Sequence, residues 1–338
     1  RNISVGGPSI IRKPGAFRSN LELTNSLRSN FLAAKQEFAA FSASSSNSAA
    51  ASVSATPNGT STPNGAPAAT TTAAPSAPSS FRTSETTQET LYIPRIDWSS
   101  TPGLSEAPSS YDITAKLFFL PTSLPLSARP AYAREALRLV MRELRVSSIS
   151  LLIVSFPGMS FEGDCEWEAD KTNARQGDHD TELATWTDAI EPLHDQGLVA
   201  QLGIAEFGSD KLARFVEKVR VKPVVDQINI KNCCDVPPPL VQLAKEQKIE
   251  LFVHSDCTDI LPQGTLRELL GHGVRGAGVL EDPQEDGVSN GNNGAGEDLG
   301  LLKGEITPLW VVKYTAVVRD RGVIENKGYF AGAVLEEE

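Results

Sequence analysis

A lysine inside an apolar segment is the first residue of this sequence that could do chemistry. The segment DITAKLFFLP at 112–121 has the composition of a buried strand and carries Lys116 at its centre. An ammonium group buried without a partner costs several kcal/mol, so such a lysine reaches solvent, pairs with a carboxylate or takes part in a reaction. We expect Lys116 to point inward and to be held by an acidic or carbonyl partner.

The cysteines and histidines are too scattered along the chain to indicate a metal site. They are Cys165, Cys233, Cys234, Cys257, His179, His194, His254 and His272. Neither the paired cysteine spacing of a zinc site nor an HExxH pattern is present, so we expect no metal. Four cysteines in a chain of 338 residues do not make a disulfide scaffold, and reduced thiols are the default expectation.

Composition indicates a soluble protein that does not bind nucleic acid. The formal net charge is −11 at pH 7, whereas non-specific nucleic-acid binding needs a basic field. No apolar run approaches the length of a membrane-spanning helix, and the start RNISVGGPSIIRKPGAFR lacks the apolar centre of a secretory signal. We therefore expect a cytoplasmic protein with no membrane partner.

Three segments depart from the composition of a folded core. The tract at 42–80 is rich in Ser, Ala, Pro and Thr, and its few large apolar groups predict disorder. The acidic, Gly- and Asn-rich stretch at 281–300 predicts a flexible surface loop. A polar insertion at 162–180 carries Cys165, and we expect it to lie outside the core.

Strand and helix patterns alternate through the rest of the chain. Strands are predicted at 112–120, 148–156, 198–207, 224–230 and 249–254, and helices at 130–146, 181–195, 210–219, 237–248 and 259–271, with Ser209 as a helix cap. This alternation predicts an α/β fold with a parallel sheet covered by helices. The number of units favours a closed (β/α)8 TIM-type barrel over an open doubly wound sheet, and no GxGxxG motif follows a strand.

Residues 184–230 resemble the middle of the aldo-keto reductases, and ITAKLF at 113–118 is similar to the strand that carries their catalytic lysine. The resemblance implies a single barrel domain over 1–338, interrupted at 42–80 and 281–300. In that family a tyrosine, a lysine, an aspartate and a histidine share the carbonyl chemistry, and the barrel binds NADPH. Only Lys116 matches this set, because Ser155 stands where the family has its histidine and the Asp-x4-Tyr motif is absent.

Most residues that contact the cofactor in that family are also replaced in this sequence. Ala205-Glu206 replaces the Ser-Asn pair that holds the nicotinamide amide, His254 replaces the stacking tyrosine, and Gln227 is retained. The resemblance thus implies a vestigial reductase pocket of Lys116, Ser155, Gln227 and His254, with no catalytic residue. No cofactor is expected, although vestigial NADPH binding stays open.

A more specific resemblance covers 221–261 and 308–333, which look like the regulatory (modifier) subunits of glutamate–cysteine ligase. It implies a non-catalytic partner of the ligase's catalytic subunit, in a heterodimer with improved use of glutamate and weaker feedback inhibition by glutathione. The residues that it assigns to partner or redox contact are Cys233, Cys234, Arg321, Lys327 and Tyr329. Cys233 and Cys234 are either incidental or involved in thiol-dependent contact with the partner.

Two alternatives remain at this stage. The chain could be a divergent NADPH-dependent reductase, or a barrel that still binds a nicotinamide cofactor as a sensor through Lys116 and Gln227.

Trp310 and Tyr314 are interpreted as a pair at i and i+4 of a helix, packed in the core or exposed at an interface.

Overall fold

The computed structural model describes residues 2–8, 19–50, 83–84, 90–94, 96, 98–99, 101–123, 125–161, 163–230, 235–272, 276–281 and 302–336. Three of the sequence predictions concern segments that lie wholly or mainly outside these described residues. The residues outside are Cys233, Cys234, 51–80 of the Ser/Ala/Pro/Thr tract and 282–300 of the acidic loop.

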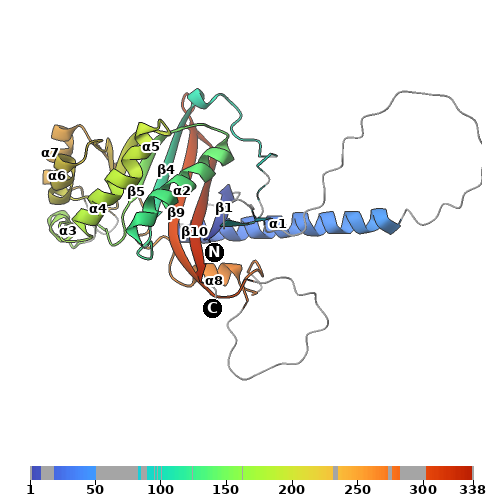
Figure 1. The fold of residues 1–338 in the computed structure, drawn as a ribbon. Coiled ribbons are helices and arrows are strands. Elements are labelled where there is room, and N and C mark those ends of the chain that lie inside the picture. Colours follow the sequence, from blue (N-terminus) through green and yellow to red (C-terminus); the bar gives the residue numbers. More distant parts are fainter. Residues whose placement is uncertain are drawn as a thin grey trace, which may run out of the picture.

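Ten described strands form one mixed sheet (Figure 1). The strands are β1 (Asn2–Pro8), β2 (Thr83–Ser84), β3 (Thr90–Ile93), β4 (Tyr111–Phe119), β5 (Ile149–Ser155), β6 (Val199–Ala205), β7 (Val225–Ile228), β8 (Glu250–Val253), β9 (Glu305–Val318) and β10 (Val323–Glu336). Their order is β2-β3-β1-β10-β9-β4-β5-β6-β7-β8. The run from β4 to β8 is parallel, whereas β9 is antiparallel to both β4 and β10. Within the described residues no ladder joins the end strands β8 and β2.

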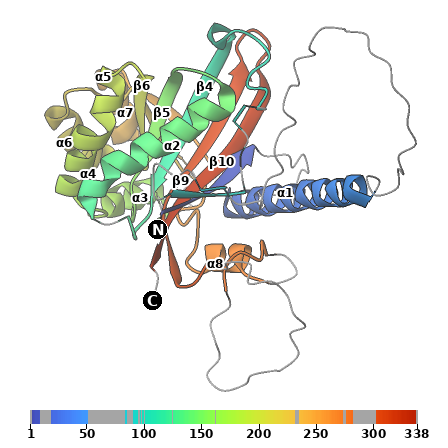
Figure 2. The ribbon, with the colours of Figure 1, turned by 45° about the vertical axis from the view of Figure 1, so that its right-hand side comes forward.

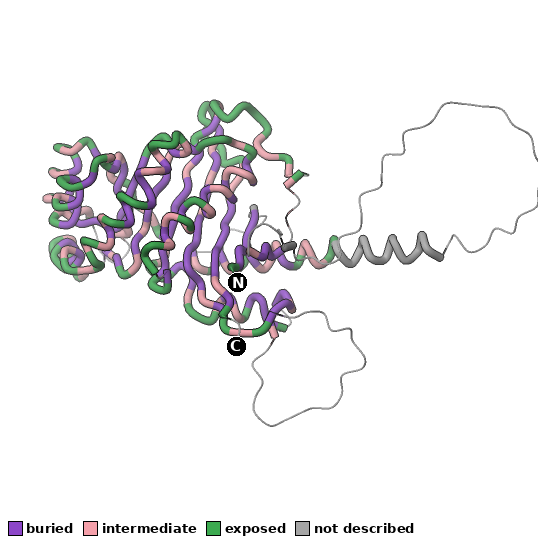
Figure 3. The backbone as a smooth tube through the Cα atoms, in the orientation of Figure 1, coloured by how far each residue is buried: buried purple, intermediate pink, exposed green. Residues whose placement is uncertain are grey.

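Helices lie on both faces of this sheet (Figures 1 and 2). They are α1 (Ser19–Ala50), α2 (Arg129–Leu144), α3 (Glu166–Asn173), α4 (His179–Thr185), α5 (Glu191–Asp195), α6 (Ser209–Lys218), α7 (Pro238–Gln247) and α8 (Thr265–Leu270), with a π-helical turn, Trp186–Ile190, between α4 and α5. Helices α2 to α7 contribute to one hydrophobic core, whereas α1 and α8 contribute to a second core on β1, β9 and β10. Figure 3 shows the buried residues concentrated in the sheet and in the helix faces that cover it.

The two faces of β4 and β9 differ in chemistry because side chains alternate along a strand. On β4, Ile113, Ala115, Leu117 and Phe119 pack in the core beneath the helices, and on β9 the same core receives Trp310, Val312, Tyr314 and Ala316. The intervening residues therefore point to the opposite face. This alternation places Lys116 of β4 and Lys313 of β9 on the same side of the sheet.

The predicted α/β class is confirmed, and each predicted strand and helix between 112 and 271 has an observed counterpart. The interpretation of Trp310 and Tyr314 as helical is wrong, because both lie on β9. Residues i and i+4 share a face in a strand as well as in a helix, and the β-branched sequence around them favours the strand. Their placement in the core is confirmed, since Trp310 is 3% exposed and Tyr314 stacks on Phe330 with ring centroids 5.9 Å apart.

Two predictions of unfolded or peripheral segments need correction. Helix α1 extends to Ala50, so residues 42–50 are helical. The insertion at 162–180 is part of the fold, because it forms α3 and the start of α4 and buries Ala169, Asp170 and Asn173. Polar composition concealed these contacts, since Asp170 and Asn173 are buried through hydrogen bonds and not through apolar packing.

The buried carboxyl group of Glu143 on α2 should make stability depend on pH. Burial raises the pKa of Glu143 from 4.5 to about 7, so its folded state binds the proton more tightly than its unfolded state. The wild type should therefore lose stability as pH rises from 4.5 to about 7. We expect Glu143→Gln to raise the free energy of unfolding by roughly 2 kcal/mol at pH 8 and to have little effect at pH 4.

Urea unfolding of both proteins at several pH values measures this effect. Glu217→Gln, at an exposed position of α6, is the matched control and should change nothing. A destabilised Glu143→Gln variant at pH 8 would show that the carboxylate has a stabilising partner.

Candidate functional site

One carboxylate holds the lysine identified in the sequence. Lys116 Nζ donates to Asp256 Oδ2 at 2.9 Å, and Lys313 Nζ donates to Asp256 Oδ1 at 3.0 Å. The side chains of Lys116 and Asp256 are only 6% and 8% exposed. The prediction that Lys116 has an acidic partner is confirmed, and the partner is Asp256, just beyond the end of β8.

The strand register explains why two lysines share this carboxylate. Lys116 and Lys313 are direct partners in the antiparallel β4–β9 ladder. Like charges directly opposite each other destabilise a sheet, so an anion between them is needed. Burial acts to raise the pKa of Asp256, but the two ammonium groups outweigh burial and lower it below its usual range. Burial lowers the pKa of Lys116, while Asp256 opposes that change.

His254 lies beside this cluster. The backbone amide of Asp256 donates to His254 Nδ1 at 3.1 Å. The other ring nitrogen, Nε2, lies 2.8 Å from Glu206 Oε1, without hydrogen-bond geometry. Asn229 adds a backbone contact to Glu206 Oε2 at 3.4 Å, and its side chain donates to Asp256 O at 2.9 Å. Glu206, His254 and Asp256 thus form one connected set.

The backbone of Glu206 is strained and is held by the polar insertion. Its φ of 64° is left-handed, which is unfavourable for a residue with a side chain. Asn173 of α3 donates to Glu206 O at 2.7 Å and accepts from the amide of Gly208 at 2.7 Å. Asp170 accepts from the Ser209 amide at 2.7 Å. The predicted cap by the Ser209 side chain is therefore wrong, because Asp170 of α3 performs this function.

A cavity of about 290 Å³ adjoins the lysines. Its lining comprises Thr114, Lys116, Ile153, Gln227, His254, Ser255, Asp256, Lys313 and Thr315. Three of the four residues predicted to form a vestigial reductase pocket are therefore brought together, namely Lys116, Gln227 and His254. Ser155 is not part of this lining; it lies at the end of β5, in register with Phe118.

The nicotinamide cofactor implied by the aldo-keto reductase resemblance does not fit these residues. Ala205 offers no side-chain donor to a carboxamide, and the Glu206 carboxylate is directed at His254. The imidazole is in turn held by the Asp256 amide, so it is not free to stack on a ring. A cavity of about 290 Å³ is also at the lower limit for small-molecule sites.

The tail residues assigned to partner contact are placed in two regions. Lys327 and Tyr329 donate to the two carboxylate oxygens of Glu22 on α1, at 2.8 and 3.0 Å. Tyr329 is 1% exposed, so its side chain is not presented to a partner, which corrects that part of the prediction. Arg321 lies in the β9–β10 turn, where it pairs with Glu106 and is largely exposed.

Sequence reasoning missed Asp256 and Lys313. Asp256 directly follows a predicted strand and His254, a position at which functional groups collect in α/β proteins. Lys313 interrupts the apolar run LWVVKYTAVV as Lys116 interrupts its own strand. The same signal was therefore present twice, but the helical interpretation of the tail concealed the second instance.

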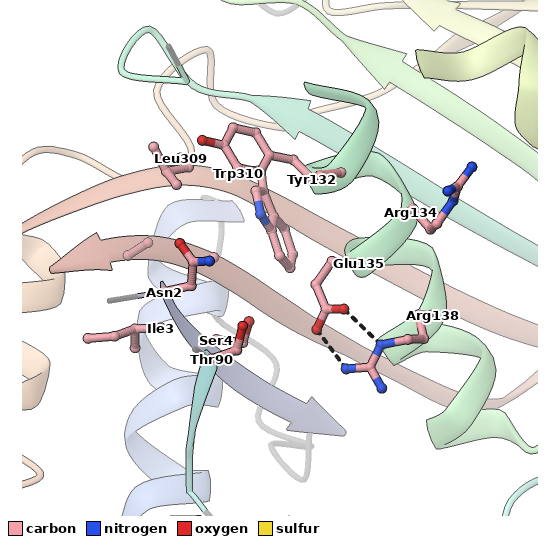
Figure 4. A pocket seen from close by; sticks show the side chains of 13 residues that line it. Asn2, Ile3, Ser4, Thr90, Tyr132, Arg134, Glu135, Arg138, Leu309 and Trp310 are labelled. Carbon is pink, nitrogen blue, oxygen red and sulfur yellow. Dashed lines mark hydrogen bonds and ion pairs between the residues drawn. The ribbon is translucent and has the colours of Figure 1, made fainter. Parts of the chain in front are cut away.

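A second cavity, of about 460 Å³, lies between α2 and the strands β1, β3, β9 and β10 (Figure 4). Glu135 and Arg138 of α2 form one wall and bond to each other, with Arg138 Nε donating to Glu135 Oε2 at 2.7 Å. Tyr92 of β3 donates to Glu135 Oε1 at 2.9 Å. These groups satisfy one another and tie α2 to β3, so this cavity is a weaker candidate for chemistry than the lysine cluster.

The described part of the chain holds neither a candidate metal site nor a candidate membrane-spanning helix. No group of three or more His, Cys, Asp or Glu side chains there is arranged to hold a metal ion. None of the helices in those residues is long and apolar enough to cross a membrane.

Sequence comparison shows that this chain is similar to aldo-keto reductases and to glutamate–cysteine ligase regulatory subunits. Residues 103–268 match the aldo/keto reductase family. A Schizosaccharomyces pombe protein named as a glutamate–cysteine ligase regulatory subunit is 26% identical over 233 residues, 67% of this chain and 72% of that protein. The human glutamate–cysteine ligase regulatory subunit is 23% identical over 65% of each chain, and the rat protein is 25% identical over 45% of this chain and 46% of its own. The chain thus spans about half to three quarters of these relatives.

Solved structures give only partial superpositions. An aldose reductase of Giardia lamblia is 23% identical, covers 42% of this chain and 44% of its own, and has a TM-score of 0.29. An aldo-keto reductase of Bombyx mori in complex with NADP is 18% identical, covers 41% and 39%, and also has a TM-score of 0.29. The family match confirms the α/β fold of the aldo-keto reductase kind, and the sequence relatives confirm the resemblance to the regulatory subunits.

Replacing Asp256 should show how far the fold depends on this carboxylate. Asp256→Asn leaves two neighbouring ammonium groups without their counter-charge, and we expect it to lower the free energy of unfolding by roughly 3 kcal/mol at pH 7. The folded-state pKa of Asp256 lies below its ordinary value of 3.8, so its stabilising contribution is present above that pH. The difference between the wild type and the variant should shrink as pH falls below about 4.

Chemical denaturation at pH 7 and pH 3 measures both effects. The double variant Asp256→Asn/Lys116→Met should be less destabilised than the sum of the single variants, because the second substitution removes the buried ammonium that the first leaves without its carboxylate. Additive effects would show that Lys116 and Asp256 do not stabilise each other.

Proposed function

We propose that this chain is a non-catalytic regulatory subunit of glutamate–cysteine ligase that binds the ligase's catalytic subunit. The observation that carries the proposal is the similarity to glutamate–cysteine ligase regulatory subunits, which extends over 67% of this chain in the Schizosaccharomyces pombe protein. Binding would improve the use of glutamate by the catalytic subunit and relieve its feedback inhibition by glutathione. A partner produces such effects when it binds the competent conformation of an enzyme more tightly than the inhibited one.

The chemistry of the lysine cluster supports the absence of reductase activity. Carbonyl reduction in this fold needs a proton donor, and a tyrosine serves only if its pKa is lowered toward neutrality. Burial instead raises the pKa of Tyr329, the partner of Lys313 in the β9–β10 ladder. The ammonium group of Lys116 is bound by Asp256, and the aldo-keto reductase resemblance puts Ser155 where that family has its histidine. These features support a structural role for Lys116.

Exposed groups of the tail supply the surface for a partner. Arg321 is largely exposed at the β9–β10 turn, and Lys327 is partly exposed beside α1. Val323 and Ile324, next to Arg321, expose 56% and 53% of their surface. An apolar and cationic surface of this kind suits the centre of a protein interface, where Arg and apolar side chains are enriched. The partner or redox role of Cys233 and Cys234 stays a prediction.

Mixing the two purified chains tests the proposal. We expect a one-to-one complex on gel filtration, a lower apparent KM for glutamate and weaker inhibition by glutathione. Arg321→Ala should weaken the complex by about tenfold, the cost of losing one well-placed charged contact. Arg175→Ala, at another exposed arginine, is the control. Unchanged kinetics and no comigration would overturn the regulatory role.

Purified protein alone tests the alternative of a divergent NADPH-dependent reductase or cofactor sensor. We expect no reduction of aldehydes with NADPH, and we expect Lys116→Met to lower the melting temperature without removing an activity. Retention of Lys116 and Gln227 at one cavity is the observation that keeps this alternative worth testing. Turnover by the wild type that disappears in Lys116→Met would favour the reductase.

A further inference from the structure

The cavity beside Lys116 carries hydrogen-bond donors that the fold does not use. Thr114 and Thr315 lie directly opposite each other in the β4–β9 ladder, and both line the cavity. Contacts within the described part of the chain leave their hydroxyl groups and the side-chain amide of Gln227 available. Polar side chains that converge on a cavity without bonding one another are typical of a ligand site.

The two ammonium groups on the same side of the sheet have N–H donors that are not bonded to Asp256. Each ammonium has three N–H groups, and Lys116 and Lys313 each give one to Asp256. The Lys313 side chain is 32% exposed, so its remaining donors are accessible. Lys313 and Thr315 are two residues apart on β9 and therefore point to the same side of the sheet. An ammonium and two hydroxyls on one wall suit the two oxygens of a carboxylate.

The same cavity also carries hydrogen-bond acceptors. Its lining includes the Asp256 carboxylate, which lies between the two lysines, together with the Gln227 amide and the Ser255 hydroxyl, and these groups can accept hydrogen bonds from an ammonium or amide. Donors and acceptors within one cavity match a molecule with a carboxylate close to an amine or amide. A volume of about 290 Å³ suits an amino acid or a short peptide and is small for a dinucleotide.

We propose that this cavity binds the carboxylate of an amino acid or short peptide through Lys313, Thr114 and Thr315, in place of a nicotinamide cofactor. The inference rests on the proposed function only for the choice of probes, which are glutamate and glutathione. Ligand binding to this chain alone would make the regulatory subunit itself responsive to a substrate of the ligase or to its feedback inhibitor.

Calorimetric titration of the purified full chain, without any partner, tests the site. We expect saturable binding of glutamate or glutathione, and weaker binding of acetate, which lacks the second polar group. Lys313→Met and Thr315→Val should each weaken binding about tenfold, the expected loss for one charge-assisted or well-placed hydrogen bond. Thr315→Val preserves the shape of the side chain and so guards against misfolding of the lysine variant. Lys303→Met, at an exposed lysine that pairs with Glu281, is the matched control and should bind as the wild type does.

Several results would overturn the inference. They are no saturable binding of glutamate or glutathione, equal affinity in the wild type, Lys313→Met and Thr315→Val, or acetate binding as tightly as the larger ligands. Saturation by NADPH with no binding of either carboxylate would likewise overturn it and favour a cofactor site. Because the catalytic subunit is absent from this titration, its failure is independent of whether the two subunits form a complex.

Discussion

The contact on which much of this structure depends is a single carboxylate placed between two lysines. Lys116 and Lys313 face each other across the β4–β9 ladder, and Asp256 accepts one hydrogen bond from each. Without that anion the central antiparallel pair would place two like charges directly opposite each other, one of them buried. Asp256 also fixes the chain beyond β8, because the next amide, that of Cys257, donates to Ser19 Oγ at the start of α1. The Asp256 side chain thus connects β4 and β9 to the segment after β8, and the adjoining backbone amide connects that segment to α1.

A second set of contacts connects the polar insertion to the same site. Asn173 and Asp170 of α3 hold the loop after β6, and this loop contains Glu206 in its left-handed conformation. Glu206 in turn faces His254, whose other ring nitrogen accepts from the Asp256 amide. A strained residue persists only where its surroundings determine its conformation, and here the insertion supplies those surroundings. The insertion therefore stabilises the loop that carries Glu206 and belongs to the folded core of the protein.

Elsewhere the fold neutralises its buried charges locally. Lys211 of α6 pairs with Glu182 of α4 at 2.9 Å, and both side chains are almost fully buried. Burial raises the pKa of Asp226 well above its usual range, which favours the neutral form of this carboxyl. The lysine cluster differs because its cations exceed the one carboxylate that bridges them, and because it borders a cavity.

The sequence by itself determined the α/β class, the strand and helix units between 112 and 271 and the presence of a partner for Lys116. These features follow from local periodicity and from the cost of burying an unpaired ammonium, and both can be read from consecutive residues. Only the tertiary structure decided that the partner is Asp256, 140 residues away, and that Lys313 shares it. Strand pairing, not local pattern, brought these residues together. Residues 308–318 suited either a helix or a strand by the spacing of Trp310 and Tyr314, and pairing with β4 and β10 selected the strand. The polar insertion was misjudged for a related reason, since Asp170 and Asn173 are polar and the hydrogen-bond partners that bury them lie far along the chain.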